Sequence, residues 1–209
     1  MTEQLEKALY VVATPIGNLG DITHRALHIL KEVDIIAAED TRNSKSLLSH
    51  FGLSGRLIAV HEHNEYHAAD GIIKLLSEGK SVALVTDAGT PAISDPGSHL
   101  VEKVMAAGHR IIPIPGPSAL IAAISASGLG EQGFLFHGFL PAKSKDRKNV
   151  LTSLRNAALP YVLVFYESPH RIAETVADLC EVFESTSELV ICRELTKKFE
   201  TIQRLPLLQ

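Results

Sequence analysis

The sequence predicts an α/β fold with two domains, each built from alternating strands and helices. Short apolar runs rich in β-branched residues recur along the chain, and stretches with helical periodicity separate them. Several of these runs end in turns of glycine, proline and short polar residues. Strands that alternate with helices usually pair in parallel, so we expect an N-terminal parallel sheet with helices on both faces.

The first part of the chain supplies five expected strands. Each is a short, mostly apolar run, and they cover residues 9–12, 34–38, 57–60, 82–85 and 110–114. Helices are expected over residues 21–32, in a segment ending at residue 51, and over residues 68–77, 99–107 and 117–127. Asp21 is the expected N-cap of the first helix.

A glycine-rich stretch, residues 127–133, marks the expected domain boundary. Residues 1–127 then form the N-terminal α/β domain, and residues 128–209 form a C-terminal α/β domain. In the second domain, strands are expected over residues 134–139, 161–165 and 188–192, and helices over residues 144–157 and in a segment ending at residue 183. Three strands make a small mixed sheet, which we expect to be incomplete.

Composition and charge narrow the class of protein. Hydrophobic residues make up 45% of the chain and charged residues 21%, as in globular proteins. The start of the chain is polar, and no apolar run is long enough to span a membrane, so we expect a cytoplasmic protein. The formal net charge of -4 argues against bulk attraction to nucleic acid, although residues 143–148 concentrate cations. Cys180 and Cys192 are interpreted as buried free thiols.

Several common motifs are missing or weak. Gly17 is a single glycine after the first strand, so the dinucleotide-binding pattern is absent. Residues 61–67 hold three histidines and two glutamates, but alternation after a strand scatters them over opposite faces, so no metal is expected. Ser118 lacks the second glycine of a nucleophile elbow, so a hydrolase triad is only weakly supported.

Polar turns follow the expected strands, and residues 86–91 form the central one. Asp87 would lie at the carboxyl edge of the sheet, where open α/β sheets bind ligands, and Gly89 would let a ligand approach the main chain. Residues 13–18, 39–42 and 115–119 end other strands in the same way. An ordinary strand-to-helix loop is the alternative interpretation of residues 86–91.

Seven short motifs occur in a fixed order along residues 9–203. They are Ala13–Leu19, Ala38–Arg42, Asp87–Pro91, Asp95–Gly97, Pro115–Ala119, Gly138–Pro141 and Phe165–Arg171. Together they resemble the tetrapyrrole methylase superfamily, and within it the enzymes that methylate the 2'-hydroxyl of a cytidine ribose in 16S ribosomal RNA. The resemblance implies S-adenosyl-L-methionine as methyl donor, a cleft between two α/β domains, a homodimer, and ribosomal RNA or the small ribosomal subunit as partner.

The same resemblance implies the residues that contact the cofactor. They are Ile16, Asp87, Gly89, Thr90, Ile93, Ser118, Ala119 and Tyr166. For Ile16, Ile93 and Ala119, packing in the core is an equally good interpretation. Thr90 stands where tetrapyrrole enzymes carry an aspartate, which agrees with an RNA substrate.

A ribose hydroxyl is a poor nucleophile, so a group must accept its proton. Asp40 or Glu167 is the expected proton acceptor, and Arg42, Arg171 or Lys197 would contact phosphate or oxygen. A salt-bridge network that braces the domains is the alternative role for these residues.

Two further functions stay open from the sequence. The acceptor could be a tetrapyrrole or another small metabolite. The chain could also bind donor or RNA without turnover, because family members usually continue beyond the segment that ends this sequence, residues 204–209.

Overall fold

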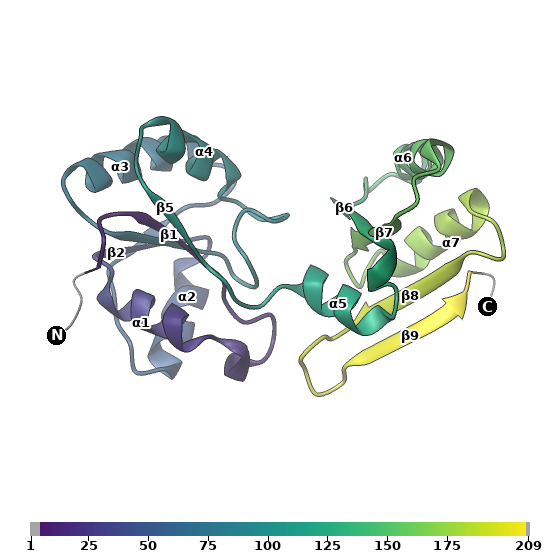
Figure 1. The fold of residues 1–209 in the computed structure, drawn as a ribbon, viewed down its shortest axis with the longest axis horizontal. Coiled ribbons are helices and arrows are strands. Elements are labelled where there is room, and N and C mark those ends of the chain that lie inside the picture. The colour runs from purple at the N-terminus through teal and green to yellow at the C-terminus, as the bar shows by residue number, and fades with distance from the viewer. Residues whose placement is uncertain (1–4, 208–209) are drawn as a thin grey trace. The chain divides into compact units, whose positions relative to one another are not determined.

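The computed structural model describes residues 5–207 (Figure 1). Residues 1–4 of the polar start and residues 208–209 lie outside the described part. The chain divides into two compact units, residues 1–118 and 119–209, and each is described by itself. This division places the helix α5 (Ala119–Ser127) in the second unit, and the domain boundary after residue 127 stays a prediction.

The first unit is built on a five-stranded parallel sheet. The strand order is β3 (Leu57–Ala59), β2 (Ile35–Ala38), β4 (Val82–Val85), β1 (Leu9–Val12) and β5 (Ile111–Ile114). All four neighbouring pairs run parallel. The predicted parallel sheet is therefore confirmed, with strand bounds within one residue of those expected from the apolar runs.

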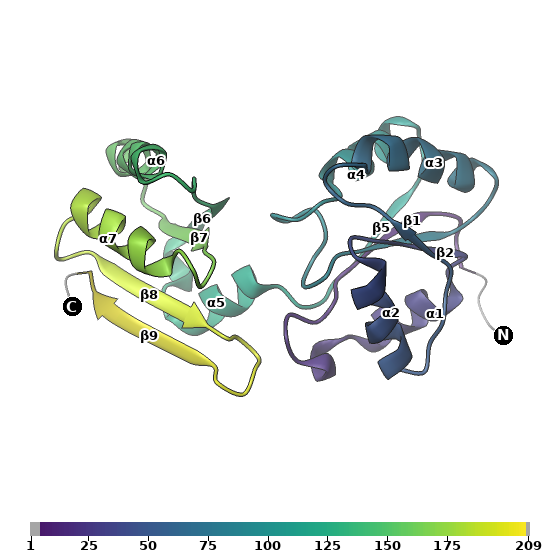
Figure 2. The same cartoon turned by 180° about the vertical axis from the view of Figure 1, so that it is seen from behind.

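Helices cover both faces of this sheet, as Figures 1 and 2 show from opposite sides. The helices α1 (His24–Glu32) and α2 (Thr41–His50) share one buried cluster with Tyr10, Val12 and alternate residues of the other strands. The helices α3 (Glu65–Ser77) and α4 (Ser98–Ala106) share the other cluster with Leu9 and its neighbours on the opposite face. Because the central strands β1, β2 and β4 are buried on both faces, they are continuous apolar runs.

The second unit starts with α5 and the short helix η2 (Gly130–Gln132). Its further elements are β6 (Phe134–Phe139), α6 (Ser144–Ala157), β7 (Val162–Tyr166), α7 (Ile172–Val182), β8 (Glu188–Arg193) and β9 (Thr201–Pro206). The strands β6 and β7 pair in parallel, and β8 and β9 form an antiparallel pair. The second unit thus has two small sheets where one mixed sheet was expected.

Three details of the predicted elements were wrong. Asp21 ends a short helix, η1 (Leu19–Asp21), and the side chain of Thr23 caps α1 by accepting the N–H of Ala26 at 3.0 Å. The helix α3 begins at Glu65, three residues before the expected start. Only three strands were expected in the second domain, so β9 was missed.

Two further findings concern the described residues only. Within residues 5–207, no helix has both the length and the apolar character needed to cross a membrane. Cys180 and Cys192 are free thiols, half-buried rather than fully buried, and the thiol of Cys180 donates to the carbonyl of Leu207 at 3.0 Å.

Candidate functional site

The turns that follow β1, β4 and β5 are joined to one another at the carboxyl edge of the first sheet. Thr14 and Gly89 exchange two main-chain hydrogen bonds, of 2.9 and 3.0 Å, which link the turns after β1 and β4. The Thr90 hydroxyl donates to the carbonyl of Pro117 at 3.1 Å and so links the turns after β4 and β5. Parallel strands end at one edge, which is why motifs far apart in the sequence meet here.

Gly89 lies in the turn after β4, between Ile16 and Pro117. Its φ is +86°, a conformation that favours glycine. A methyl group placed on Gly89 would lie 3.4 Å from Cγ2 of Ile16 and 4.0 Å from the carbonyl oxygen of Pro117. The missing side chain therefore leaves the main chain open beside Ile16, and three predicted cofactor residues, Ile16, Gly89 and Thr90, lie together.

Asp87 connects the turn after β4 with the turn after β2. Its carboxylate accepts the N–H of Asp40 at 3.3 Å and the side-chain amide of Asn43 at 2.8 Å. The N–H of Asp87 donates to the Glu39 carboxylate at 3.3 Å. The contacts of Glu39 and Asn43 were not predicted, although both residues lie in or beside the 38–42 motif.

Ile93 and Ser118, the two other predicted cofactor residues of the first unit, lie in loops beside the linked turns. Ile93 is 43% exposed, in a loop where Ala92 and Ser94 have φ values of +67° and +59°. Non-glycine residues with positive φ are strained, and such strain often occurs beside binding sites. Ser118 is half-buried and directly follows Pro117, the acceptor of the Thr90 hydrogen bond.

Three carboxylates, those of Glu39, Asp87 and Asp95, interact electrostatically at this edge. Burial raises the pKa of Asp95 to about 6 from 3.8, and the negative charges of Glu39 and Asp87 add to the increase. A cluster of this kind attracts a cationic ligand.

Replacing Asp95 with asparagine is expected to stabilise the first unit at neutral pH but not at pH 4. Because the pKa in the folded state lies above the ordinary value, folding favours the protonated form, and stability falls as the pH rises from about 4 to about 6. At pH 7.5 the variant should gain at most about 3 kcal/mol. Melting curves at both pH values check this, and an equal shift at both would contradict it.

Asp40 and Arg42 form the first turn of α2. The Asp40 carboxylate caps the helix by accepting the N–H of Arg42 at 2.8 Å, and it also accepts from the Arg42 guanidinium at 2.7 and 3.1 Å. These bonds to Arg42 lower the pKa of Asp40 to about 2. A carboxylate with so low a pKa is a weak proton acceptor. The Arg42 side chain is 89% exposed, which leaves it accessible to a phosphate.

In the second unit, Ala119 begins α5, and Tyr166 is the last residue of β7. The Tyr166 hydroxyl accepts the N–H of Leu120 at 3.0 Å. The Tyr166 ring packs edge-on against Phe136 and Phe139, with ring centres 4.9 and 5.7 Å apart. A cavity of about 410 Å³ within this unit is lined by Ala119, Tyr166 and Glu167 among other residues.

The two other predicted catalytic residues lie in different places within the second unit. Glu167 follows β7 directly, and its side chain is 6% exposed. Lys197 lies in the turn between β8 and β9, where it pairs with Glu194 at 3.1 Å. The structure thus brings Asp40 to Asp87 in the first unit, whereas Glu167 belongs to a separate network in the second.

The histidine-rich segment, residues 61–67, has a structural role through Glu65. The Glu65 carboxylate accepts the N–H of Gly97 at 3.1 Å and of Leu100 at 2.9 Å, and so caps the start of α4 from a neighbouring helix. Among the described residues, no three histidine, cysteine or acidic side chains are arranged to hold a metal ion. The sequence offered no signal for this cap, because its partners are 32 and 35 residues away.

The fold places the chain in a structural class of α/β proteins with two compact units. Solved structures of methyltransferases share this fold. The chain superposes on the methyltransferase CobJ with a TM-score of 0.69 over 96% of this chain and 86% of that one, at 20% identity. For the cobalt precorrin-4 methyltransferase CbiF the TM-score is 0.67, at 17% identity and with 99% and 88% of the two chains covered.

The chain belongs to the tetrapyrrole (corrin/porphyrin) methylase family, whose model matches residues 8–209. Methyltransferases of this family use S-adenosyl-L-methionine. The chain is also similar to proteins named ribosomal RNA small subunit methyltransferase I. It is 54% identical to the one from Vibrio cholerae over 95% of this chain and 68% of the relative, and 52% identical to the one from Escherichia coli O157:H7 over the same shares. The Xylella fastidiosa Temecula1 protein is 56% identical over 93% and 70%.

Proposed function

We propose that the protein transfers a methyl group from S-adenosyl-L-methionine to the 2'-hydroxyl of a cytidine ribose in 16S ribosomal RNA of the small subunit. The observation that carries this proposal is the 54% identity to a small-subunit ribosomal RNA methyltransferase over 199 residues. That match includes the linked turns of the first sheet. Solved tetrapyrrole enzymes of similar fold are only 17 to 20% identical, so they support the fold and not the acceptor.

The residues at the edge of the first sheet fit the donor. S-adenosyl-L-methionine supplies an activated methyl group on a positively charged sulfonium. Gly89 leaves an open stretch of main chain beside Ile16, which suits a flat adenosyl group. Asp87, Glu39 and Asp95 supply negative charge nearby. Among residues 5–207, the buried hydroxyl of Thr86, next to Asp87, is one of a few polar atoms without a hydrogen-bond partner.

The chain's own residues then have little covalent work to do. They must hold the acceptor hydroxyl in line with the methyl group and keep water away. The main chain of Gly89 and Thr90 would pack against the donor, and the exposed guanidinium of Arg42 would contact an RNA phosphate. Asp40 is fixed as the helix cap, so it would act by orienting Arg42.

The basic run of residues 143–148 contributes less to RNA binding than the sequence suggested. Arg147 is fully buried and Lys148 pairs with Glu181 at 2.9 Å. Lys143 and Lys145 are exposed and stay available for phosphates.

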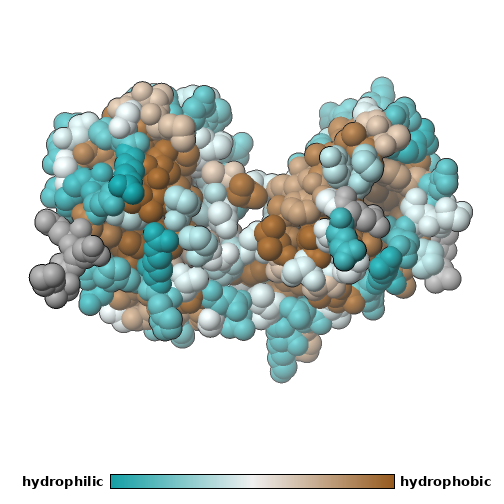
Figure 3. Space-filling view, in the orientation of Figure 1, coloured by the Kyte–Doolittle hydropathy of each residue, from teal (hydrophilic) through white to brown (hydrophobic). Residues whose placement is uncertain are grey.

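A homodimer and a cytoplasmic location are part of the proposal. Large apolar side chains are exposed on the second unit, and Figure 3 shows apolar surface there over the region of α5, β6 and β7. Exposed apolar patches mark interaction sites. The exposed apolar residues of the second unit include Ile121, Phe134, Phe139, Leu159, Tyr161 and Phe199. Sedimentation at several concentrations tests the dimer. The cytoplasmic location follows from the proposed ribosomal substrate.

The test incubates the protein with tritiated donor and small ribosomal subunits from cells that lack this methylation. Label is expected in 2'-O-methylcytidine, which also protects the adjacent phosphodiester from alkaline cleavage. Large subunits serve as the control. Label on a base, or on an added tetrapyrrole instead of RNA, would contradict the acceptor. Donor binding without any transfer would favour the non-catalytic alternative.

A further inference from the structure

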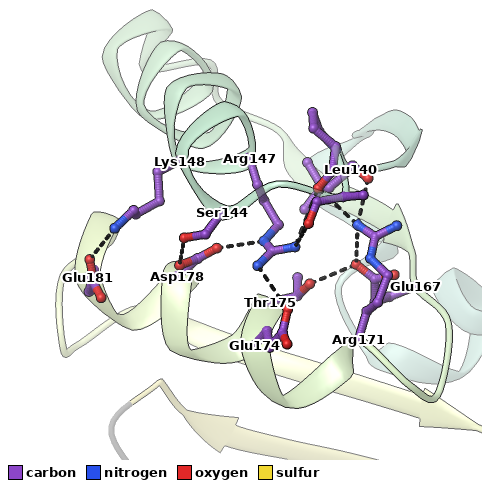
Figure 4. A network of polar contacts seen from close by, with 12 residues as sticks. Leu140, Ser144, Arg147, Lys148, Glu167, Arg171, Glu174, Thr175, Asp178 and Glu181 are labelled. Atoms are coloured by element: carbon purple, nitrogen blue, oxygen red, sulfur yellow. Dashed lines mark hydrogen bonds and ion pairs between the residues drawn. The ribbon is translucent and has the colours of Figure 1, made fainter.

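The carboxylate of Glu167 is enclosed by donors of its own unit. It accepts the N–H of Ser168 at 2.8 Å and the hydroxyl of Thr175 at 2.7 Å, and it lies 3.3 Å from Nη2 of Arg171 (Figure 4). An ionised carboxylate can accept about four hydrogen bonds; two of these sites are taken, and the guanidinium of Arg171 faces the carboxylate as an ion pair. With the side chain only 6% exposed, little room is left for an acceptor hydroxyl.

Two arginines in the same network bind the turn that follows β6. Nη2 of Arg171 donates to the carbonyls of Leu140 and Pro141, at 2.7 and 2.9 Å. Nη1 of Arg147 donates to the carbonyls of Pro141 and Ala142, at 3.3 and 3.2 Å. Three successive carbonyls are therefore held by two guanidinium groups, as Figure 4 shows around Leu140.

Each arginine is held in turn by a carboxylate. Glu167 holds Arg171, and Asp178 accepts Nε of the fully buried Arg147 at 2.6 Å. Asp178 also accepts the hydroxyl of Ser144 at 2.8 Å. Burial raises the pKa of Asp178, but the hydrogen bonds from Ser144 and Arg147 outweigh it and keep the pKa below its ordinary value. Both carboxylates thus serve to orient guanidinium groups.

The turn that the two arginines bind follows Phe139 directly, and Phe139 packs against Tyr166. The pairing of β6 and β7 shifts register between Phe136 and Gly138, where Gly138 has a φ of +80°. A bulge of this kind redirects the next side chain. Phe139 is therefore paired with Tyr166, and their rings pack with centres 5.7 Å apart.

We propose that Glu167, Arg171, Arg147 and Asp178 form a clamp that fixes the carboxyl ends of β6 and β7, and that Glu167 is a positioning residue and not the proton acceptor. The clamp acts through Phe139 on Tyr166. The proposal rests on the proposed function, because it takes Tyr166 as a contact of the donor. In this role, the hydrogen bonds from Ser168 and Thr175 fix the buried Glu167 carboxylate, and its ion pair orients Arg171.

The test compares Glu167→Gln, Arg171→Lys and the double variant with Glu181→Gln, a control that removes an exposed carboxylate from α7, the helix that carries Thr175 and Asp178. Donor affinity is measured by calorimetry, and kcat is measured at saturating donor over a range of pH. Each clamp variant should raise the donor Kd about tenfold, since Glu167→Gln removes the charge that orients Arg171 and Arg171→Lys removes the planar guanidinium that binds two carbonyls. The donor Kd of the double variant should be no higher than that of the single variant with the higher Kd, because the two residues act as one unit. The pH profile should keep its shape, and the control should behave like the unchanged protein.

The opposite pattern would overturn the clamp. If Glu167→Gln loses more than about a hundredfold in kcat and the acidic limb of its pH profile, with unchanged donor Kd and a near-normal Arg171→Lys, then Glu167 is the proton acceptor. Should Glu167→Gln fail to fold, Thr175→Val is used instead. It removes one hydrogen bond that positions the Glu167 carboxylate and leaves the charge of Glu167 in place. Unaltered donor affinity in that variant would also contradict the clamp. An unchanged protein that binds no donor at all would contradict the proposed function together with the clamp.

Discussion

Replacing Arg147 with methionine is expected to destabilise the second unit by about 3–5 kcal/mol, because it leaves a buried carboxylate without its counter-charge. Arg147 has no exposed side-chain surface, and its partner Asp178 has 6%. The pair also joins α6 to α7. Urea unfolding followed by hydrogen exchange of these two helices measures the loss.

Two companion variants make the result specific to this pair. Lys148→Met removes the neighbouring cation of α6, whose pair with Glu181 lies at the surface, and should leave the transition where it is. Arg147→Met combined with Asp178→Leu should recover most of the stability, since a matched apolar pair carries no desolvated charge. If Arg147→Met alone unfolds like the unchanged protein, the buried pair has no structural role.

Replacing Gly89 with valine is expected to raise the donor Kd at least a hundredfold. A β-branched residue is strained at a φ of +86°, and its side chain would fill the space beside Ile16 where the main chain is proposed to face the adenosyl group. Calorimetric titration with S-adenosyl-L-methionine measures the effect.

Gly79→Val provides the matched control. Gly79 has a φ of +76° in the turn after α3, and nothing lies within 4 Å of a side chain built on it. Both variants should therefore lose comparable stability through backbone strain, whereas only Gly89→Val should lose donor affinity. Equal donor affinity in the two variants would show that the turn after β4 is not a donor contact.

The first sheet could be predicted closely because its central strands, β1, β2 and β4, are buried on both faces. Such strands are unbroken apolar runs, and the predicted bounds of the run at Val82–Val85 were confirmed to the residue. Helix starts were harder, because Asp21 and Thr23 are both good capping residues and only the structure shows which one accepts the N–H of Ala26.

The strand β9 could not be predicted because it lacks a buried face. All of its residues are exposed, so its sequence carries no alternation of apolar and polar side chains. It is held by main-chain pairing with β8 and by the ion pair of Arg204 with Glu188, partners that the sequence does not identify.

The turns of the candidate site could be located from the sequence, but the roles of the carboxylates could not. Asp40, Glu65 and Glu167 all follow or lie near strand ends, where a base or a metal ligand is a reasonable hypothesis. A carboxylate that caps a helix or orients an arginine has the same residue type and position. What distinguishes Glu167 is its partner Thr175 and the arginine it holds, and these contacts exist only in the folded unit.

A crystal structure of the protein with S-adenosyl-L-homocysteine, the product of methyl transfer, tests the central claim most directly. The adenosyl group is predicted to lie against the main chain of Gly89 and Thr90, beyond the carboxyl ends of β1, β4 and β5. Electron density for the ligand at any other place, with side chains filling the space beside Gly89, would contradict the account.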